Sequence, residues 1–118
     1  MSVSFLGAAA ARALDAPRSQ PEPETRESCC QKYRDIFTFR NRKDEAAVPD
    51  LISLFHSTSS VLLRHEVAYA LGQMQRLDAI PFLSELLQDG DEHPITRHEA
   101  AEALGAIEAL PHCRVPQR

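Results

Sequence analysis

The sequence predicts an all-α protein, an α-solenoid of about two and a half helical hairpin repeats. A short motif occurs twice, at residues 64–72 (RHEVAYALG) and again, one repeat later, at residues 97–105 (RHEAAEALG). Apolar residues recur at spacings of three and four around both copies, as they do on the buried face of a helix. Two-helix repeats of this length are typical of solenoids, in which each unit buries its apolar face only against its neighbours.

Five helices follow from the apolar periodicity. They are expected at residues 30–41, 45–56, 61–75, 79–88 and 96–108. Pro49 and Pro81 fall in the first turns of the second and fourth helices, where a missing backbone N–H costs little. Asp78 is the expected N-cap of the fourth helix. Gly72 and Gly105 are expected to permit close helix approach. Tyr69 is assigned to the core, with a place in the site as the alternative.

The two ends of the chain are not expected to join the repeats. Residues 17–27 are rich in Pro, Glu, Arg, Ser and Thr, a composition that cannot bury a core. We therefore expect a disordered leader over residues 1–27, a repeat domain over 28–109 and an irregular tail over 110–118. The segment 1–18 matches a mitochondrial transit peptide only weakly.

Composition limits the class of protein. A net charge of −4 argues against a nucleic-acid partner and suits a cationic one. No apolar run approaches the roughly 20 residues that span a bilayer, so no membrane association is expected. Three cysteines, two of them adjacent, do not form a disulfide framework and indicate a reducing, cytoplasmic location.

Packing does not explain the His-Glu pair in each motif copy, because a packed helix needs Ala and Leu at its contacts. Equivalent positions of neighbouring repeats lie side by side, at helix separations of about 8–10 Å. His65 and His98 are therefore expected to face each other across one gap. Two imidazoles and a carboxylate around one ion are typical of non-heme Fe(II) sites.

Each His-Glu pair also has a simpler interpretation as a solvated or capping pair. Thr96 and Glu99 fit a capping box, with Glu99 at the third helical position. Leu63 stands where Thr96 stands in the other copy, so capping cannot explain Glu66. Adjacent helical residues point about 100° apart, which leaves Glu66 able to approach a second metal or a cationic substrate.

A family resemblance adds to this reading. The motif copies, extended to residues 64–75 and 94–107, and the upstream stretch 33–41 closely resemble deoxyhypusine hydroxylase over roughly residues 28–109. That family consists of HEAT-repeat di-iron monooxygenases that hydroxylate deoxyhypusine in the hypusine-carrying translation factor, using O₂ and a reductant. The resemblance implies that His65, His98 and Glu99 ligate one iron. It also implies that Glu66 faces the metal or the substrate amine, and it points to no catalytic residue beyond these.

The number of His-Glu pairs departs from the family pattern. The family carries four pairs in two related halves, and this sequence has two. Ligands for one iron are thus present, and a second half-site is expected from a partner chain or a second copy. The alternatives are a catalytically silent HEAT-repeat binding module or fragment, and a scaffold without metal.

Overall fold

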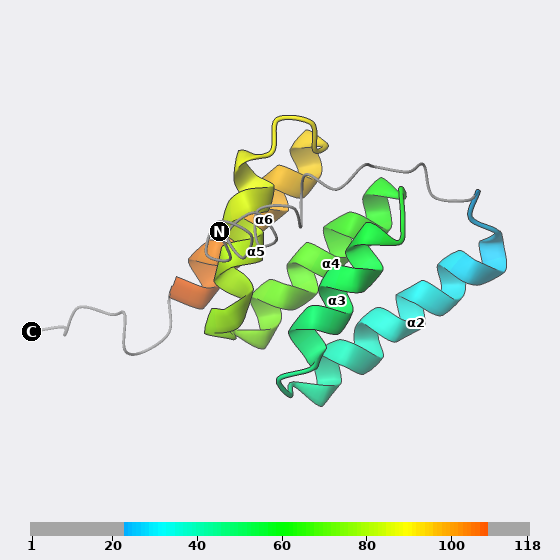
Figure 1. The fold of residues 1–118 in the computed structure, drawn as a ribbon, viewed down its shortest axis with the longest axis horizontal. Coiled ribbons are helices and arrows are strands. Elements are labelled where there is room, and N and C mark those ends of the chain that lie inside the picture. The colour runs from blue at the N-terminus through cyan, green and yellow to red at the C-terminus, as the bar shows by residue number, and fades with distance from the viewer. Residues whose placement is uncertain (1–22, 109–118) are drawn as a thin grey trace, which may run out of the picture.

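The computed structural model describes residues 23–108, and every regular element in that range is helical (Figure 1). The elements are α2 (Arg26–Arg42), α3 (Ala47–His56), α4 (Val61–Met74), the 3₁₀ turn η1 (Leu77–Ala79), α5 (Ile80–Gln88) and α6 (Pro94–Glu108). The predicted all-α class is therefore confirmed. The tail 110–118 and most of the predicted leader lie outside the described residues. None of the described helices is long and apolar enough to cross a membrane.

The helices stack as a short solenoid. Helix α4 packs against α2 on one side and α6 on the other, while α3 pairs with α4 and α5 pairs with α6. The two pairs α3/α4 and α5/α6 are the complete repeats, and α2 is the half repeat before them (Figure 1). Helices α3 and α5 meet edge to face through Phe55 and Phe82, whose ring centroids lie 5.2 Å apart.

The core runs continuously between the two repeats. Its fully buried members include Leu51, Leu71, Leu83 and Leu86. Where α4 crosses α6, a Cβ atom at Gly72 would lie 2.8 Å from Cα and Cβ of Ala103. Gly72 thus permits the predicted close approach, because any larger residue would meet the backbone of the neighbouring helix. A Cβ atom at Gly105 would meet nothing within 4 Å, so no described helix approaches closely there.

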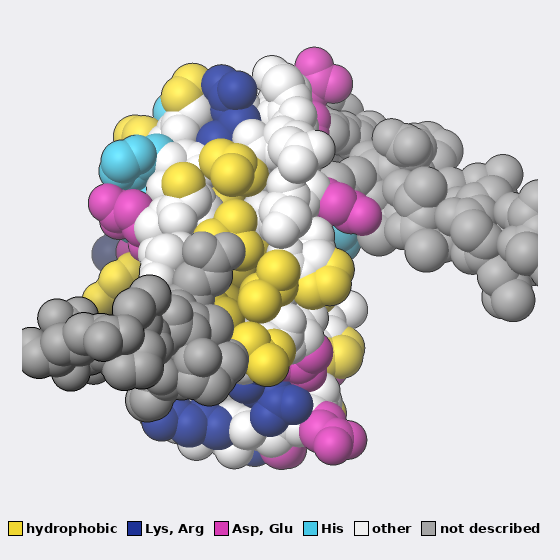
Figure 2. Space-filling model, turned by 90° about the vertical axis from the view of Figure 1, so that its left-hand side faces the viewer, with side chains coloured by type: hydrophobic (Ala, Val, Ile, Leu, Met, Phe, Trp, Pro, Cys, Tyr) yellow, Lys and Arg dark blue, Asp and Glu magenta, His cyan; other side chains and the backbone are white. Residues whose placement is uncertain are grey.

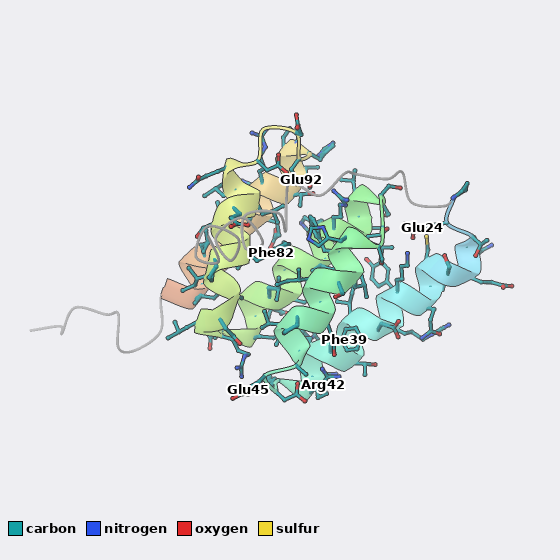
Figure 3. All side chains as sticks on the ribbon, in the orientation of Figure 1. Glu24, Phe39, Arg42, Glu45, Phe82 and Glu92 are labelled. Carbon is teal, nitrogen blue, oxygen red and sulfur yellow. The ribbon has the colours of Figure 1, made fainter. Side chains whose placement is uncertain are left out.

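Helix α2 begins before its predicted start at residue 30. Thr25 caps it, since its side chain accepts a hydrogen bond from Ser28 N at 3.0 Å. The preceding Glu24 accepts hydrogen bonds from Thr58 Oγ1 and from Ser59 N, the latter at 3.1 Å (Figure 3). The last residues of the predicted leader are therefore held against the turn between α3 and α4.

Three other details of the prediction are wrong. Asp78 does not cap α5; it lies within η1 and binds Arg76, with Nε 3.0 Å from Oδ1. Thr96 does not form a capping box, because α6 begins at Pro94, a residue favoured at the first helical position. Tyr69 is 44% exposed and not in the core, and its hydroxyl accepts a hydrogen bond from Gln73 Nε2 at 3.1 Å.

Candidate metal and substrate site

Neighbouring repeats meet through His65 on α4 and Glu99 on α6. The Nε2 atom of His65 lies 3.0 Å from Oε2 of Glu99. The Glu99 side chain is only 8% exposed, and a carboxylate with so little access to water needs a partner. A contact between the motif copies is thus present, and the buried glutamate is free of the capping role that the sequence allowed it.

Glu66 approaches the other ring nitrogen of His65. Its Oε1 atom lies 3.3 Å from Nδ1, and both side chains are partly buried. A carboxylate at each ring nitrogen holds the imidazole in one orientation. Metal-ligating histidines commonly have this arrangement, in which the second ring nitrogen donates its proton to a carboxylate.

His98 lies apart from this cluster. Its side chain is 73% exposed, and Nε2 lies 3.1 Å from Oε1 of Glu102, one turn further along α6. Adjacent helical residues point about 100° apart, so the phase of α6 that turns Glu99 toward α4 turns His98 toward solvent. The expectation that the two histidines face each other across the repeats is not met.

Arg64 fixes the start of α4, one residue before His65. Its Nη1 atom lies 2.8 Å from Oε2 of Glu92, and its Nε donates to the carbonyl of Thr58 at 2.8 Å. The guanidinium also stacks over Phe55, 4.6 Å from the ring centroid. Glu92 stands in the loop between α5 and α6 (Figure 3). The sequence expectations did not include this link, although the basic residue that opens each motif copy is a signal for it.

Tyr33 extends the site to α2. Burial raises the pKa of the Tyr33 phenol, and the negative charge of Glu66 raises it further. Tyr33 occupies the position in α2 that corresponds, one repeat earlier, to His65. The half-buried phenol therefore stays protonated at neutral pH and lies within the electrostatic reach of the site.

The donor atoms fit part of a metal site. His65 Nε2 and Glu99 Oε2 lie 3.0 Å apart, the distance of a hydrogen-bonded pair. Imidazole and carboxylate donors also suit Fe(II). In the part of the chain that is described, no group of three His, Cys, Asp or Glu side chains is assembled to hold a metal. His65 and Glu99 are thus in contact with each other, and His98 does not join them in the structure.

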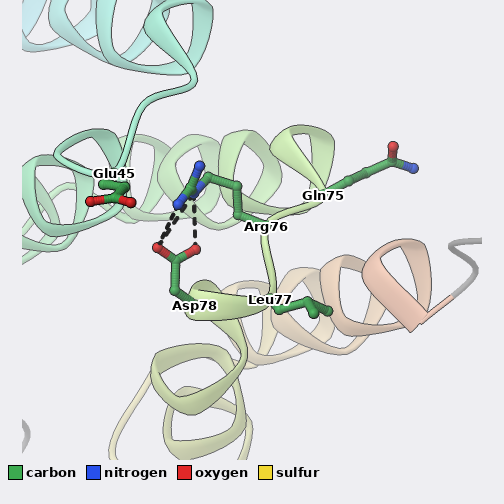
Figure 4. Close-up of a pocket in the computed structure, with 5 residues that line it drawn as sticks. All are labelled: Glu45, Gln75, Arg76, Leu77 and Asp78. Atoms are coloured by element: carbon green, nitrogen blue, oxygen red, sulfur yellow. Dashed lines mark hydrogen bonds and ion pairs between the residues drawn. The ribbon is translucent and has the colours of Figure 1, made fainter. Parts of the chain in front are cut away.

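A shallow pocket lies at the other end of α4, away from these residues. Glu45, Gln75, Arg76, Leu77 and Asp78 line it (Figure 4). The Arg76 guanidinium binds Asp78 and also donates to the carbonyl of Lys43 at 3.2 Å. These contacts join the connection after α4 to the end of α2, so we assign the pocket a structural role.

The repeats and the site define the class of the protein. A family model described as HEAT repeats matches residues 10–105. The chain therefore belongs to the HEAT-repeat family.

Within that class, the relatives found are deoxyhypusine hydroxylases. Deoxyhypusine hydroxylase-B of Oryza sativa subsp. japonica is 44% identical over 102 residues, covering 80% of this chain and 33% of the relative. The Arabidopsis thaliana enzyme is 53% identical over 77 residues, covering 65% of this chain and 24% of the relative. The structure of human deoxyhypusine hydroxylase in complex with glycerol matches with a TM-score of 0.61 and 35% identity, covering 88% of this chain and 35% of that one.

These matches confirm the resemblance drawn from the motif copies. They also show that the chain spans only about a quarter to a third of the length of the curated relatives it matches.

Proposed function

We propose that this chain supplies one iron-ligand set of a deoxyhypusine hydroxylase acting in the cytoplasm on the hypusine-carrying translation factor. The observation that supports the proposal is the contact between His65 and Glu99, 3.0 Å apart across two repeats. It occurs in a chain that is 44% and 53% identical to two deoxyhypusine hydroxylases. A repeat scaffold alone does not need such a pair at its inner contact.

The proposed metal ligands are His65 and Glu99, with His98 completing the set. Bound iron would supply the activation of O₂ that hydroxylation requires. His98 is 73% exposed and its partner among the described residues is Glu102, so joining the set would cost no contact in the described core. Each imidazole would bind the metal through the ring nitrogen that carries no proton.

Glu66 has two roles in this proposal. It would accept the Nδ1 proton of His65 when Nε2 binds the metal, since its Oε1 lies 3.3 Å from Nδ1. Its carboxylate is also suited to pair with the cationic amine of deoxyhypusine. Tyr33, protonated at neutral pH, provides a hydroxyl near that carboxylate and can help to orient the amine.

A second ligand set must come from another polypeptide segment in this proposal. The family resemblance implies four His-Glu pairs, and the sequence has two. Either a partner chain or a second copy of this one would complete the centre.

Iron content tests the proposal directly. The purified chain would be loaded with Fe(II) without oxygen, and iron per chain would be measured for wild type, His65→Ala and Glu99→Gln. Glu85→Gln serves as the matched control, because Glu85 is an exposed carboxylate on α5. We expect both site variants to lose iron and the control to keep it. Folded wild-type protein with no iron above background would refute the proposal.

A catalytically silent HEAT-repeat binding module is the second candidate, and the position of His98 favours it. If His98 joins a metal site, His98→Ala lowers iron affinity, whereas Glu102→Ala maintains or raises it by releasing the histidine. In a silent module neither change affects iron binding. Mass spectrometry of the deoxyhypusine-bearing factor after incubation with the protein separates the two cases. An active assembly would add one oxygen atom to the factor, and an inactive one would not.

A further inference from the structure

His65 and Glu99 both lie near the start of their helices. His65 is the fifth residue of α4, which begins at Val61, and Glu99 is the sixth residue of α6, which begins at Pro94. The N–H groups of a first helical turn have no partner within the helix, and helix ends fray. The separation of the two side chains therefore depends on what holds these two helix starts in relation to each other.

Arg64, the residue before His65, contacts both helix starts. Its Nε donates at 2.8 Å to the carbonyl of Thr58, in the turn before α4, and its Nη1 lies 2.8 Å from Oε2 of Glu92, in the loop before α6. The guanidinium also lies over the ring of Phe55, 4.6 Å from its centroid. Because a planar guanidinium holds two acceptors in a fixed geometry, Arg64 sets the spacing of the two segments that lead into α4 and α6.

Both acceptors of Arg64 are themselves held in place. Thr58 is fully buried, and its hydroxyl donates to Glu24 and accepts from the backbone N–H of Ser60, the N-cap of α4, at 3.1 Å. The Glu92 side chain is only 4% exposed, and its other oxygen accepts from the N–H of the next residue at 3.3 Å. The contacts therefore form a continuous polar chain from the residues before α2 to the start of α6.

A buried ion pair of this kind serves register better than stability. Much of the attraction between its charges is offset by the cost of removing them from water, and its best-attested role is to select one arrangement of packed elements. The close crossing at Gly72 lies about 10 Å further along α4 than His65. That crossing fixes how near α4 and α6 come, and a second tether at the helix starts is needed to fix the angle between them.

Side chains outside this polar chain are not positioned in the same way. Figure 2 shows histidine and acidic side chains next to one another at the surface, on the side of the molecule where α5 and α6 lie. His98 and Glu102 form such a pair, and their side chains are 73% and 60% exposed. The Glu99 side chain is 8% exposed. The scaffold therefore controls the inner pair and leaves the outer pair open to solvent.

We propose that Arg64 is a positioning residue for the contact between His65 and Glu99. By joining Thr58 to Glu92, it holds the starts of α4 and α6 at the spacing that places Nε2 of His65 3.0 Å from Oε2 of Glu99. The inference deepens the proposed function, and it rests on that function only where iron binding is measured.

A lysine in place of Arg64 provides the main test. Arg64→Lys keeps the positive charge and removes the guanidinium fork, so one ammonium group cannot hold both acceptors in the same geometry. Arg42→Lys is the matched control. Arg42 also joins two acceptors, with Nε 2.9 Å from Asp44 and Nη2 2.6 Å from Asp50, but it lies at the C-terminal end of α2.

Three measurements would be made on the folded full-length chain. Nuclear Overhauser effects would report the contact between the His65 ring and the Glu99 side chain. Hydrogen exchange would compare the amides of residues 97–101 in α6 with those of residues 83–88 in α5. A general loss of stability raises both exchange rates together, whereas a shifted start of α6 raises only the first. Fe(II) affinity, measured without oxygen, would be the third.

We expect Arg64→Lys to weaken the ring contact and to raise the ratio of the two exchange rates about tenfold. Fe(II) affinity should fall by about tenfold or more, and Arg42→Lys should change none of the three. Glu92→Gln keeps the shape of the side chain and removes its charge, so it should act in the same direction and keeps the test decisive if Arg64→Lys does not fold.

A folded Arg64→Lys protein with the ring contact and the exchange ratio unchanged would overturn the proposal, even if its thermal midpoint were lower. Arg64 would then be a purely structural link. Wild-type protein that binds no iron would refute the proposed function instead, and the ring contact and the exchange ratio would still decide the role of Arg64.

Discussion

A methyl group added at Gly72 has no room in the crossing of α4 and α6. The new Cβ atom would lie 2.8 Å from both Cα and Cβ of Ala103, and real Cβ atoms do not approach other carbons so closely. Because one of the two atoms belongs to the backbone, a side-chain rotation cannot relieve the clash. The whole of α6 must shift relative to α4, and the contact between His65 and Glu99 shifts with it.

The expected magnitude follows from two opposing terms. Overpacking of a core costs about 1–3 kcal/mol, while replacing a helical glycine with alanine gains about 1 kcal/mol. Gly72→Ala should therefore lower the free energy of unfolding by up to about 2 kcal/mol. Gly105→Ala has only the favourable term, reduced near the end of the helix. The free energies of unfolding of the two variants should differ by about 1–3 kcal/mol. For a domain of this size, each kcal/mol shifts the thermal midpoint by roughly 4–8 °C.

Thermal and urea unfolding followed by circular dichroism would measure both variants. The partner change Ala103→Gly removes one of the two clashing atoms, so it should restore part of the stability lost in Gly72→Ala, and the two changes should not be additive. A Gly72→Ala protein as stable as Gly105→Ala would refute the close crossing of α4 and α6 at Gly72.

Three further predictions concern the N-terminal half and the link between repeats. Burial raises the pKa of Glu24, but hydrogen bonds from Thr58 and Cys29 outweigh it and leave the pKa below its ordinary value of 4.5. The ionised carboxylate therefore stabilises the fold above that value, and this stability should be lost as the pH falls through the lowered pKa. In Glu24→Gln, the free energy of unfolding should depend less on pH between about pH 5 and 3. The hydrogen bond to Glu24, and then burial, raise the pKa of the Cys29 thiol. Alkylation of Cys29 at about pH 8, followed by peptide mass spectrometry, should therefore be slow in wild type and faster in Glu24→Gln. An unchanged alkylation rate would contradict this. Glu92→Gln should lower the free energy of unfolding by about 1–3 kcal/mol, because it leaves the guanidinium of Arg64 without its charged partner; a change below about 0.5 kcal/mol would show that the link carries no stability.

The sequence by itself determined the repeat period and the helical class, and it predicted residues for the candidate site. The motif spacing predicted two hairpins and a half repeat, because apolar periodicity and a repeated sequence motif can both be recognised in the sequence without knowing the tertiary contacts. It also selected His65 and Glu99, which the structure brings into contact. The resemblance to deoxyhypusine hydroxylase rested on the same residues.

Only the tertiary structure decided which members of the two motif copies meet. Equal spacing in sequence places the copies on neighbouring helices, but it does not state the rotation of α6 about its axis or its offset along α4. Those are set by the close crossing at Gly72 and by the start of α6 at Pro94. The result is a contact between His65 and Glu99, with His98 turned to Glu102. The inter-repeat link from Arg64 to Glu92 depended on the same docking, because its two ends are far apart in sequence and become neighbours only when the repeats stack.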